Sequence, residues 1–252
     1  MILAALLQMN PMVLAQQLQV DTLLGNDSIA NRPLILMTAL AGLALVPFVL
    51  MMVTSFVKIA VVLSIARQAI GTQQIPPTTV ITGLSIILTV YTMSPIMEEG
   101  YRRAAVVAEK APGGDLLNVK NIGVLQQALQ EGIEPMRRFL KRHAHRKDRE
   151  MFYALAKRMR KAEDRAGVDK DDYLILIPSF VISELTEAFQ IGFIIFLPFL
   201  VIDMVVSNIL MALGMMMLAP TTISLPFKLL LFVLVDGWHL LTKGLVMGYA
   251  SG

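Results

Sequence analysis

The chain has 252 residues, of which 56% are hydrophobic and 16% are charged, and its formal net charge is +3. Soluble domains are roughly 45–50% apolar and about 25% charged, so the composition excludes an ordinary soluble domain and indicates contact with lipid or a large apolar interface. Basic and acidic residues are mixed along the chain, which argues against a nucleic-acid-binding face. The absence of cysteine excludes disulfide bonds and thiolate metal sites.

Residues 1–32 are predicted to form an N-terminal extension or a signal peptide. The first twenty residues carry no charged side chain, and the segment 13–16, Val-Leu-Ala-Gln, resembles a signal-peptidase site. A signal peptide normally begins with a positive segment, and this one does not. An uncleaved extension therefore remains the alternative.

A first apolar helical hairpin is predicted over residues 33–97. Lys58 and one arginine are the only charges in this stretch. A membrane span needs about 20 apolar residues, so the stretch holds one helix over residues 34–66, kinked at Pro47, and a second over residues 78–95. The Pro-Pro pair before the second helix cannot continue a helix, and the threonines that follow can cap one.

Residues 98–172 differ sharply from their surroundings, with 17 Lys and Arg against 13 Asp and Glu, a net charge of +4. Met151, Leu155 and Met159 recur at helical spacing. The segment is predicted to form a small helical domain in water.

A second apolar hairpin is predicted over residues 173–252. Its helices are expected at 185–212 and 222–246, and a short helix is expected from residue 173. The run that begins at Gly214 and reaches a proline should end the helix at 185–212. The predicted fold is all-α: membrane-associated helical hairpins with an inserted helical extramembrane domain.

Single charges interrupt the apolar runs. Each would cost about 2.5–3.5 kcal/mol at the centre of a lipid-facing helix, so such residues normally pair with one another or face a cavity. Glu184 and Glu187 share one helix face, and a salt bridge with Lys58 or Lys228 is favoured over an acid/base pair or a metal site. Helix-end positions whose side chains reach water are the alternative for Lys58 and Lys243. The candidate buried or inter-subunit charge pairs are Lys58, Glu184, Glu187, Asp203, Lys228 and Asp236.

No enzyme motif is present. The sequence lacks a phosphate-binding loop, a nucleophile elbow and a His-Glu-x-x-His motif, so no catalytic residue, cofactor or metal site is predicted. His143 and His145 have metal-like spacing, but Arg142, Arg146 and Lys147 surround them. Their charge opposes cation binding and favours a solvated helix surface.

Three consecutive methionines, Met215, Met216 and Met217, follow Gly214. Methionine is flexible and adapts to irregular partners. In a ring of identical copies, the three could form a soft apolar constriction that blocks ions yet yields to a passing polypeptide. Ordinary core filling is the alternative.

Several long motifs resemble the FliP/SctR family in sequence and in order. The first signature is MMVTSFVKIAVVLS at residues 51–64, followed by RQAIGTQQIPP at 67–77. The second is ISELTEAFQIGF at 182–193, followed by LPFLVID at 197–203. The C-terminal signature comprises GMMM at 214–217, SLPFK at 224–228 and VDGW at 235–238.

This resemblance implies a pore-forming core subunit of the type III protein export gate, which passes unfolded polypeptides across the bacterial inner membrane. It implies an oligomeric helical cone in the secretion basal body, a closed symmetric ring of about five copies with two smaller partner families. It implies that Met215 to Met217 act as a gasket and that Lys58, Glu184, Asp203 and Lys228 lie buried between subunits. It also implies that residues 98–172 lie outside the cytoplasm.

The injectisome branch of the family is favoured over the flagellar branch. The segment QQIPP at 73–77 and the residues Glu184-Leu185-Thr186 resemble injectisome members, whereas the long N-terminus and Lys147-Asp148 resemble flagellar ones. Outside this family, the rival interpretation is a small-solute transporter or channel, which would act as a lone chain with a defined pocket.

Overall fold

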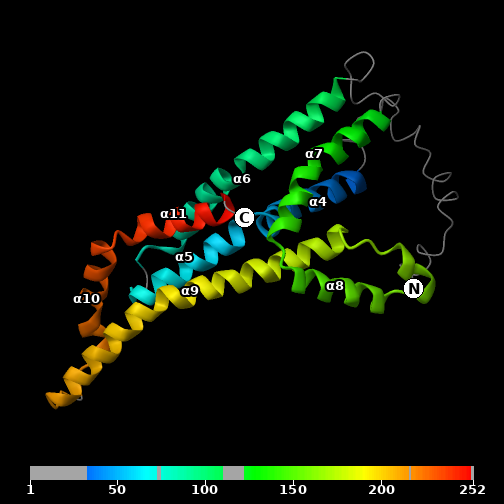
Figure 1. Cartoon of the computed structure of the whole chain (residues 1–252). Coiled ribbons are helices and arrows are strands. Elements are labelled where there is room, and N and C mark those ends of the chain that lie inside the picture. Colours follow the sequence, from blue (N-terminus) through cyan, green and yellow to red (C-terminus); the bar gives the residue numbers. More distant parts are fainter. Residues whose placement is uncertain (1–32, 73–74, 110–121, 216, 251–252) are drawn as a thin grey trace. The chain divides into compact units, whose positions relative to one another are not determined.

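The computed structural model describes residues 33–72, 75–109, 122–215 and 217–250, and these residues contain helices but no strand. The all-α prediction is confirmed. The predicted N-terminal extension at 1–32 lies outside the described residues. The helices are α4 (Pro33–Val53), α5 (Phe56–Ile70), α6 (Thr78–Ala108), α7 (Ile122–His143), α8 (Arg146–Met159), a 3-10 helix (Ala162–Gly167), α9 (Tyr173–Ala212), α10 (Pro220–Leu234) and α11 (Gly237–Ala250) (Figure 1).

Among the described residues, α6 and α9 are long and apolar enough to cross a membrane. The number of candidate spans rises to four if residues 40–53 with 56–70, and α10 with α11, each form one bent span. These helices place the protein in a membrane. The chain divides into two units, residues 1–49 and 50–252, and the packing described below is that of the second unit.

The first predicted helix is broken at a different place from the one expected. Pro47 lies inside α4, and the break falls at Thr54 and Ser55. The Ser55 hydroxyl is 2.6 Å from the Thr92 hydroxyl, and Thr54 Oγ1 accepts from the Phe56 amide at 3.5 Å. The Thr54 bond is local and competes with the helical ladder, and the Ser55 contact attaches the break to α6.

The other predicted boundaries also need correction. The helix predicted over 78–95 continues through Pro95 to Ala108 as α6. The helix predicted from 185 begins at Tyr173, because the Asp172 side chain accepts from the Leu174 amide and caps it.

The last predicted helix, 222–246, is two helices bent by 57°. The bend falls at Asp236, whose φ of 50° is left-handed, and at Gly237. A Cβ atom on Gly237 would lie 2.3 Å from the Phe232 ring, so only glycine fits this corner.

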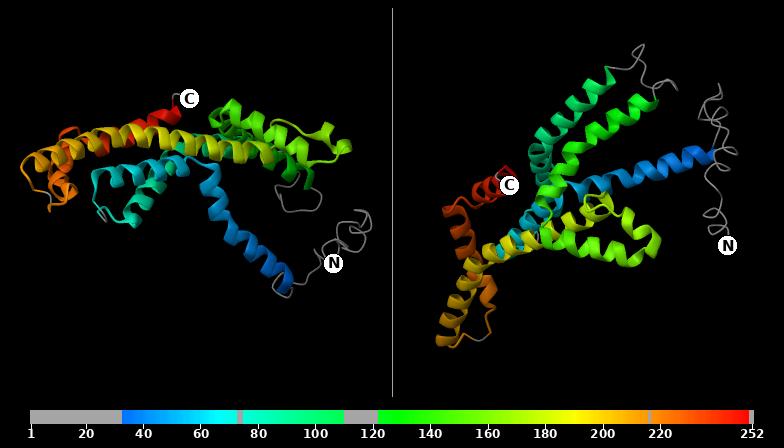
Figure 2. Two further views of the ribbon diagram at one scale, coloured as in Figure 1. Left: turned by 90° about the horizontal axis from the view of Figure 1, so that it is seen from below. Right: turned by 45° about the vertical axis from the view of Figure 1, so that its right-hand side comes forward.

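The helices of the second unit pack in neighbouring pairs. α5 lies along α9, α6 lies beside α7, and α10 folds back from the C-terminal end of α9 (Figures 1 and 2). Glycines allow the closest approaches: a Cβ on Gly192 would lie 2.4 Å from Ile65 Cδ1, and one on Gly100 would lie 2.6 Å from the Gly132 carbonyl oxygen. Small residues of this kind let apolar helices approach closely without a large buried side chain.

Three buried clusters hold these pairs together, and one of them joins Ile70 of α5, Phe199 of α9 and Phe232 of α10. Another contains Met93 of α6, Phe139 of α7 and Phe180 of α9, so the charged segment and the apolar helices share a core. The third contains Ile59 and Leu63 of α5, with members from α6, α9 and α11. The domain boundaries at residues 97 and 172 remain predictions.

Candidate functional site

A buried ion cluster lies where α5 packs on α9. Lys58 Nζ is 3.2 Å from Glu184 Oε1 and 2.5 Å from Glu187 Oε2. The side chains of Lys58 and Glu184 are 6% and 0% exposed. The structure therefore brings together three of the six charges that the sequence singles out.

Local sequence explains this meeting. Lys58 stands in the first turn of α5, just after the break at Ser55, and Glu184 and Glu187 are three residues apart on one face of α9. One ammonium group with three donors can serve both carboxylates. Removing one partner of such a pair would leave a buried unpaired charge, at a cost of about 3–5 kcal/mol.

Two further helical segments complete the cluster. Tyr249 of α11 donates its hydroxyl to Glu184 Oε2, and Lys58 Nζ lies 4.4 Å from the centre of the Tyr249 ring. His145, between α7 and α8, places Nε2 2.7 Å from Glu187 Oε1. One polar centre thus connects α5, α9, α11 and the α7–α8 junction.

Ser183 extends this network toward α8. Its hydroxyl accepts from the His145 amide at 2.8 Å and donates to Asp148 Oδ2 at 2.6 Å. The cluster then holds three carboxylates against one lysine and one histidine, drawn from α5, α8, α9 and the α7–α8 junction. No part in an ion cluster was predicted for Tyr249, Ser183 or Asp148, since none of them interrupts an apolar run as a lone charge.

The predicted solvated surface at His143 and His145 is wrong for His143. Its ring is half-buried, with ring centres 4.7 Å from Phe139 and 5.1 Å from Tyr249. Burial lowers the pKa of His143 to about 4, and the positive charges of Lys58 and Arg142 act in the same direction.

A second ion pair joins α9 to α10. Lys228 Nζ is 2.6 Å from Asp203 Oδ2, and the Ser224 hydroxyl donates to Asp203 Oδ1 at 2.5 Å. Lys228 is buried, whereas the Asp203 side chain is 27% exposed. This pair joins the two helices of the hairpin about three helical turns from its tip.

Asp236 differs from the other five charges. It lies exposed at the corner between α10 and α11, where its carbonyl oxygen accepts from the Leu240 amide at 3.0 Å. In the part of the chain that the structure describes, Asp236 makes no ion pair. Its backbone forms the corner.

The methionine run lies at the tip of the α9–α10 hairpin. The Gly214 amide donates to the Met211 carbonyl and the Met215 amide to the Leu210 carbonyl, each at 3.0 Å, with Gly214 at φ 73°. This is the Schellman arrangement that ends helices at glycine. Met215 and Met217 are 48% and 100% exposed. Met216 lies outside the described residues.

The arrangement suits a structural role. Within the described ranges, no group of three His, Cys, Asp or Glu side chains could hold a metal ion. Five of the six charges that the sequence singles out are paired with one another, and the exposed groups at the hairpin tip are apolar. Such a chain can shape and line a passage.

Comparison with known proteins identifies relatives along most of the chain. The FliP family profile matches residues 37–245. Yop proteins translocation protein R of Yersinia pestis is 46% identical over 218 residues, covering 86% of this chain and 96% of that protein. Hypersensitivity response secretion protein HrcR of Ralstonia nicotianae is 41% identical over 208 residues, covering 82% and 93%. Flagellar biosynthetic protein FliP of Pectobacterium carotovorum is 42% identical over 224 residues, covering 89% and 80%.

Proposed function

The chain belongs to the FliP family and is a type III export gate subunit, not an enzyme, and we propose that several copies of it form the wall of the channel through which unfolded polypeptides cross the membrane. It works with other components of the export apparatus. We further propose a ring of about five copies, a closed symmetric assembly, with two smaller partner families.

The observation that carries this proposal is the α9–α10 hairpin. Two apolar helices end in a turn at which Met217 is fully exposed, and the Asp203–Lys228 pair fixes their spacing behind that turn. In the lone chain Met217 packs against nothing, and about half of Met215 is exposed. Copies arranged around an axis would bring the tips together as a flexible gasket of Met215, Met216 and Met217.

The ion pairs support a wall rather than a transport site. Lys58 and Lys228 contact their acids within the chain, so in this proposal they hold the shape of each subunit. Neighbouring copies would then bury the Lys58 ion cluster and the Asp203–Lys228 pair further. Asp236, exposed at its corner, is the charge left for a contact with another subunit.

The proposed location follows from the family and from the membrane-spanning candidate helices. We place the complex in the bacterial inner membrane, within the secretion basal body, with the charged α7–α8 region outside the cytoplasm. The injectisome branch is favoured, because translocation protein R is 46% identical over 96% of its length. The flagellar relative is 42% identical over 80% of its length.

The test is the native mass of the complex, purified after co-expression with its partner subunits. A ring of several copies is expected. A chain that stays monomeric in the assembled machine would contradict the proposal and favour a small-solute transporter. Secretion of a reporter substrate, lost on deletion of the chain and restored by its return, completes the test.

A further inference from the structure

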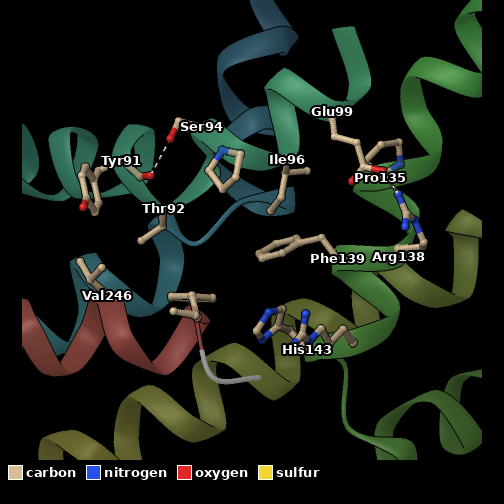
Figure 3. Close-up of a pocket in the computed structure, with 14 residues that line it drawn as sticks. Tyr91, Thr92, Ser94, Ile96, Glu99, Pro135, Arg138, Phe139, His143 and Val246 are labelled. Atoms are coloured by element: carbon tan, nitrogen blue, oxygen red, sulfur yellow. Dashed lines mark hydrogen bonds and ion pairs between the residues drawn. The ribbon is translucent and has the colours of Figure 1, made fainter. Parts of the chain in front are cut away.

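Two pockets adjoin the charged helices α7 and α8. The larger, of about 590 Å³, lies between α6, α7 and α11, and Figure 3 shows Arg138 beside Glu99 at its edge, 2.6 Å apart. The smaller, of about 270 Å³, lies between α8 and the segment that precedes α9. The residues that line the smaller pocket are Arg146, Arg149, Glu150, Tyr153 and Lys170. Its free polar groups, described next, share one chemical character.

Basic side chains outnumber acidic ones around the smaller pocket by three to one. The one acid, Glu150, accepts from Arg146 at 2.7 Å and is therefore already engaged. The pKa of Glu150 lies below its usual range, chiefly because Arg146 donates to it, and the charges of Lys170 and Arg149 act in the same direction. The pocket thus keeps a positive charge that its own acid does not neutralise, which favours an anion.

Arg149 holds a donor that has no acceptor. Its Nε atom is buried and makes no hydrogen bond to any residue that the structure describes. Asp171 lies 4.0 Å from Arg149 Nη1, too far for a hydrogen bond, and Lys141 Nζ lies 2.5 Å from the other oxygen of Asp171. Buried donors are nearly always paired in folded proteins, because an unpaired one has lost its water without replacement. An acceptor from outside the chain would satisfy this one.

The other free groups of the pocket are donors as well. Lys170 is exposed and makes no ion pair within the described ranges, and its Nζ lies 5.3 Å from the centre of the Tyr153 ring. Among the same residues the Tyr153 hydroxyl makes no hydrogen bond, and Lys157 Nζ lies 4.5 Å from the centre of its ring. A guanidinium nitrogen, an ammonium group and a hydroxyl can all donate to the oxygens of one anion.

We propose that this pocket binds a small oxyanion, either phosphate or the carboxylate of an acidic side chain. Its oxygens accept from Arg149 Nε, Lys170 Nζ and the Tyr153 hydroxyl. The volume of about 270 Å³ lies just below the roughly 300–1,000 Å³ of typical small-molecule sites, so it suits a single phosphate or carboxylate group better than a larger ligand. Because Lys170 precedes α9, the bound anion also joins α8 to the start of α9.

The experiment measures binding of inorganic phosphate and of succinate to the full chain in detergent and to the complex purified with its partner subunits. Isothermal titration calorimetry gives the dissociation constants, and chloride at equal ionic strength controls for screening. Lys170→Gln and Arg149→Gln should each weaken binding roughly tenfold, as expected for loss of one charge-assisted contact. Tyr153→Phe keeps the ring and the net charge, and it should weaken binding less.

Lys161→Gln and Arg158→Gln are the matched controls, because both residues are exposed and lie outside the pocket. Oxyanion binding that the site variants weaken and the controls keep supports the proposal. Binding by both preparations makes a free anion the ligand, whereas binding by the chain alone makes it an acidic side chain of another subunit. If Arg149→Gln does not fold, Lys170→Gln carries the test, since it changes an exposed side chain. No binding above that of chloride in either preparation, or equal weakening by the controls, overturns the proposal.

Discussion

Tyr249 donates its hydroxyl to Glu184, although 65 residues separate the two in the sequence. The bond joins the last turn of α11 to the N-terminal third of α9, and Lys58 of α5 lies against both partners. The C-terminal helix therefore closes the buried ion cluster. Leu245, one turn earlier on α11, adds a buried apolar contact to the same region.

Tyr249→Phe is expected to destabilise the protein while keeping its packing. The phenylalanine ring fills the same space, but Glu184 Oε2 loses its donor, and an unsatisfied buried group costs about 1–3 kcal/mol. The melting temperature of the purified complex measures the effect. Tyr101→Phe, on the exposed side of α6, is the matched control and should change nothing. Equal melting temperatures for all three proteins would show that the bond carries no stability.

Lys58→Met and Glu184→Gln are each expected to reduce assembly more than membrane insertion. Lys58→Met leaves Glu184 charged and buried without its cation, at a cost of about 3–5 kcal/mol, whereas Glu184→Gln leaves Lys58 paired with Glu187 alone and should cost less. Loss of a charge from an apolar run favours insertion in both variants. Yields of membrane-inserted chain and of assembled complex are measured side by side. Lys161→Met, at an exposed position, is the control. The charge swap Lys58→Glu with Glu184→Lys should restore part of the yield, and normal yields from both single variants would exclude a structural role for the pair.

His143 is expected to make the protein less stable in mild acid. Its pKa in the folded chain is about 4, against an ordinary value of 6.5. As pH falls below 6.5, the unfolded chain gains a proton that the folded chain does not accept until about pH 4, so stability is lost across this window. Melting temperatures from pH 7 to pH 4.5 measure the slope. His143→Gln should flatten the slope, and His239→Gln, at an exposed site on α11, should not.

The charge cluster shows what sequence could and could not predict. Lys58, Glu184 and Glu187 stand out because charges in apolar runs need partners, and that argument requires no coordinates. Tyr249 gives no such signal and lies beyond the segment 37–245 that the family profile matches. Its position depends on the corner at Asp236, which turns α11 back toward α9.

Helix boundaries failed for a related reason. The sequence suggested a kink at Pro47 and a helix start near residue 185, yet α4 and α9 continue through these positions. Proline lacks one backbone N–H donor, and in an apolar helix the neighbouring backbone hydrogen bonds and tertiary packing outweigh that loss. Ser55 lies at a helix break and contacts Thr92, and the sequence does not reveal this contact. The Gly214 stop was correct because its signal is local.

The methionine run provides the sharpest test of the channel proposal. Met215→Ala, Met216→Ala and Met217→Ala together should let small ions leak through the closed complex while secretion continues at least in part. Methionine has three rotatable side-chain bonds, so a ring of them closes without one fixed shape, and a narrow apolar constriction excludes water and ions. Shortening the side chains widens that constriction. Ion or dye leakage in cells that make the intact complex is measured beside secretion of a reporter substrate.

A matched triple variant tests whether leakage results from loss of the tip methionines or from loss of any three exposed methionines. Met97, Met151 and Met159 are also exposed, on α6 and α8, and their replacement by alanine should leave leakage unchanged. Phenylalanine at positions 215 to 217 should keep the seal but slow secretion, because a stiffer ring yields less readily to a passing chain. If the tip triple-alanine complex assembles at normal levels and leaks no more than the parent, the run packs against neighbouring subunits and the seal lies elsewhere.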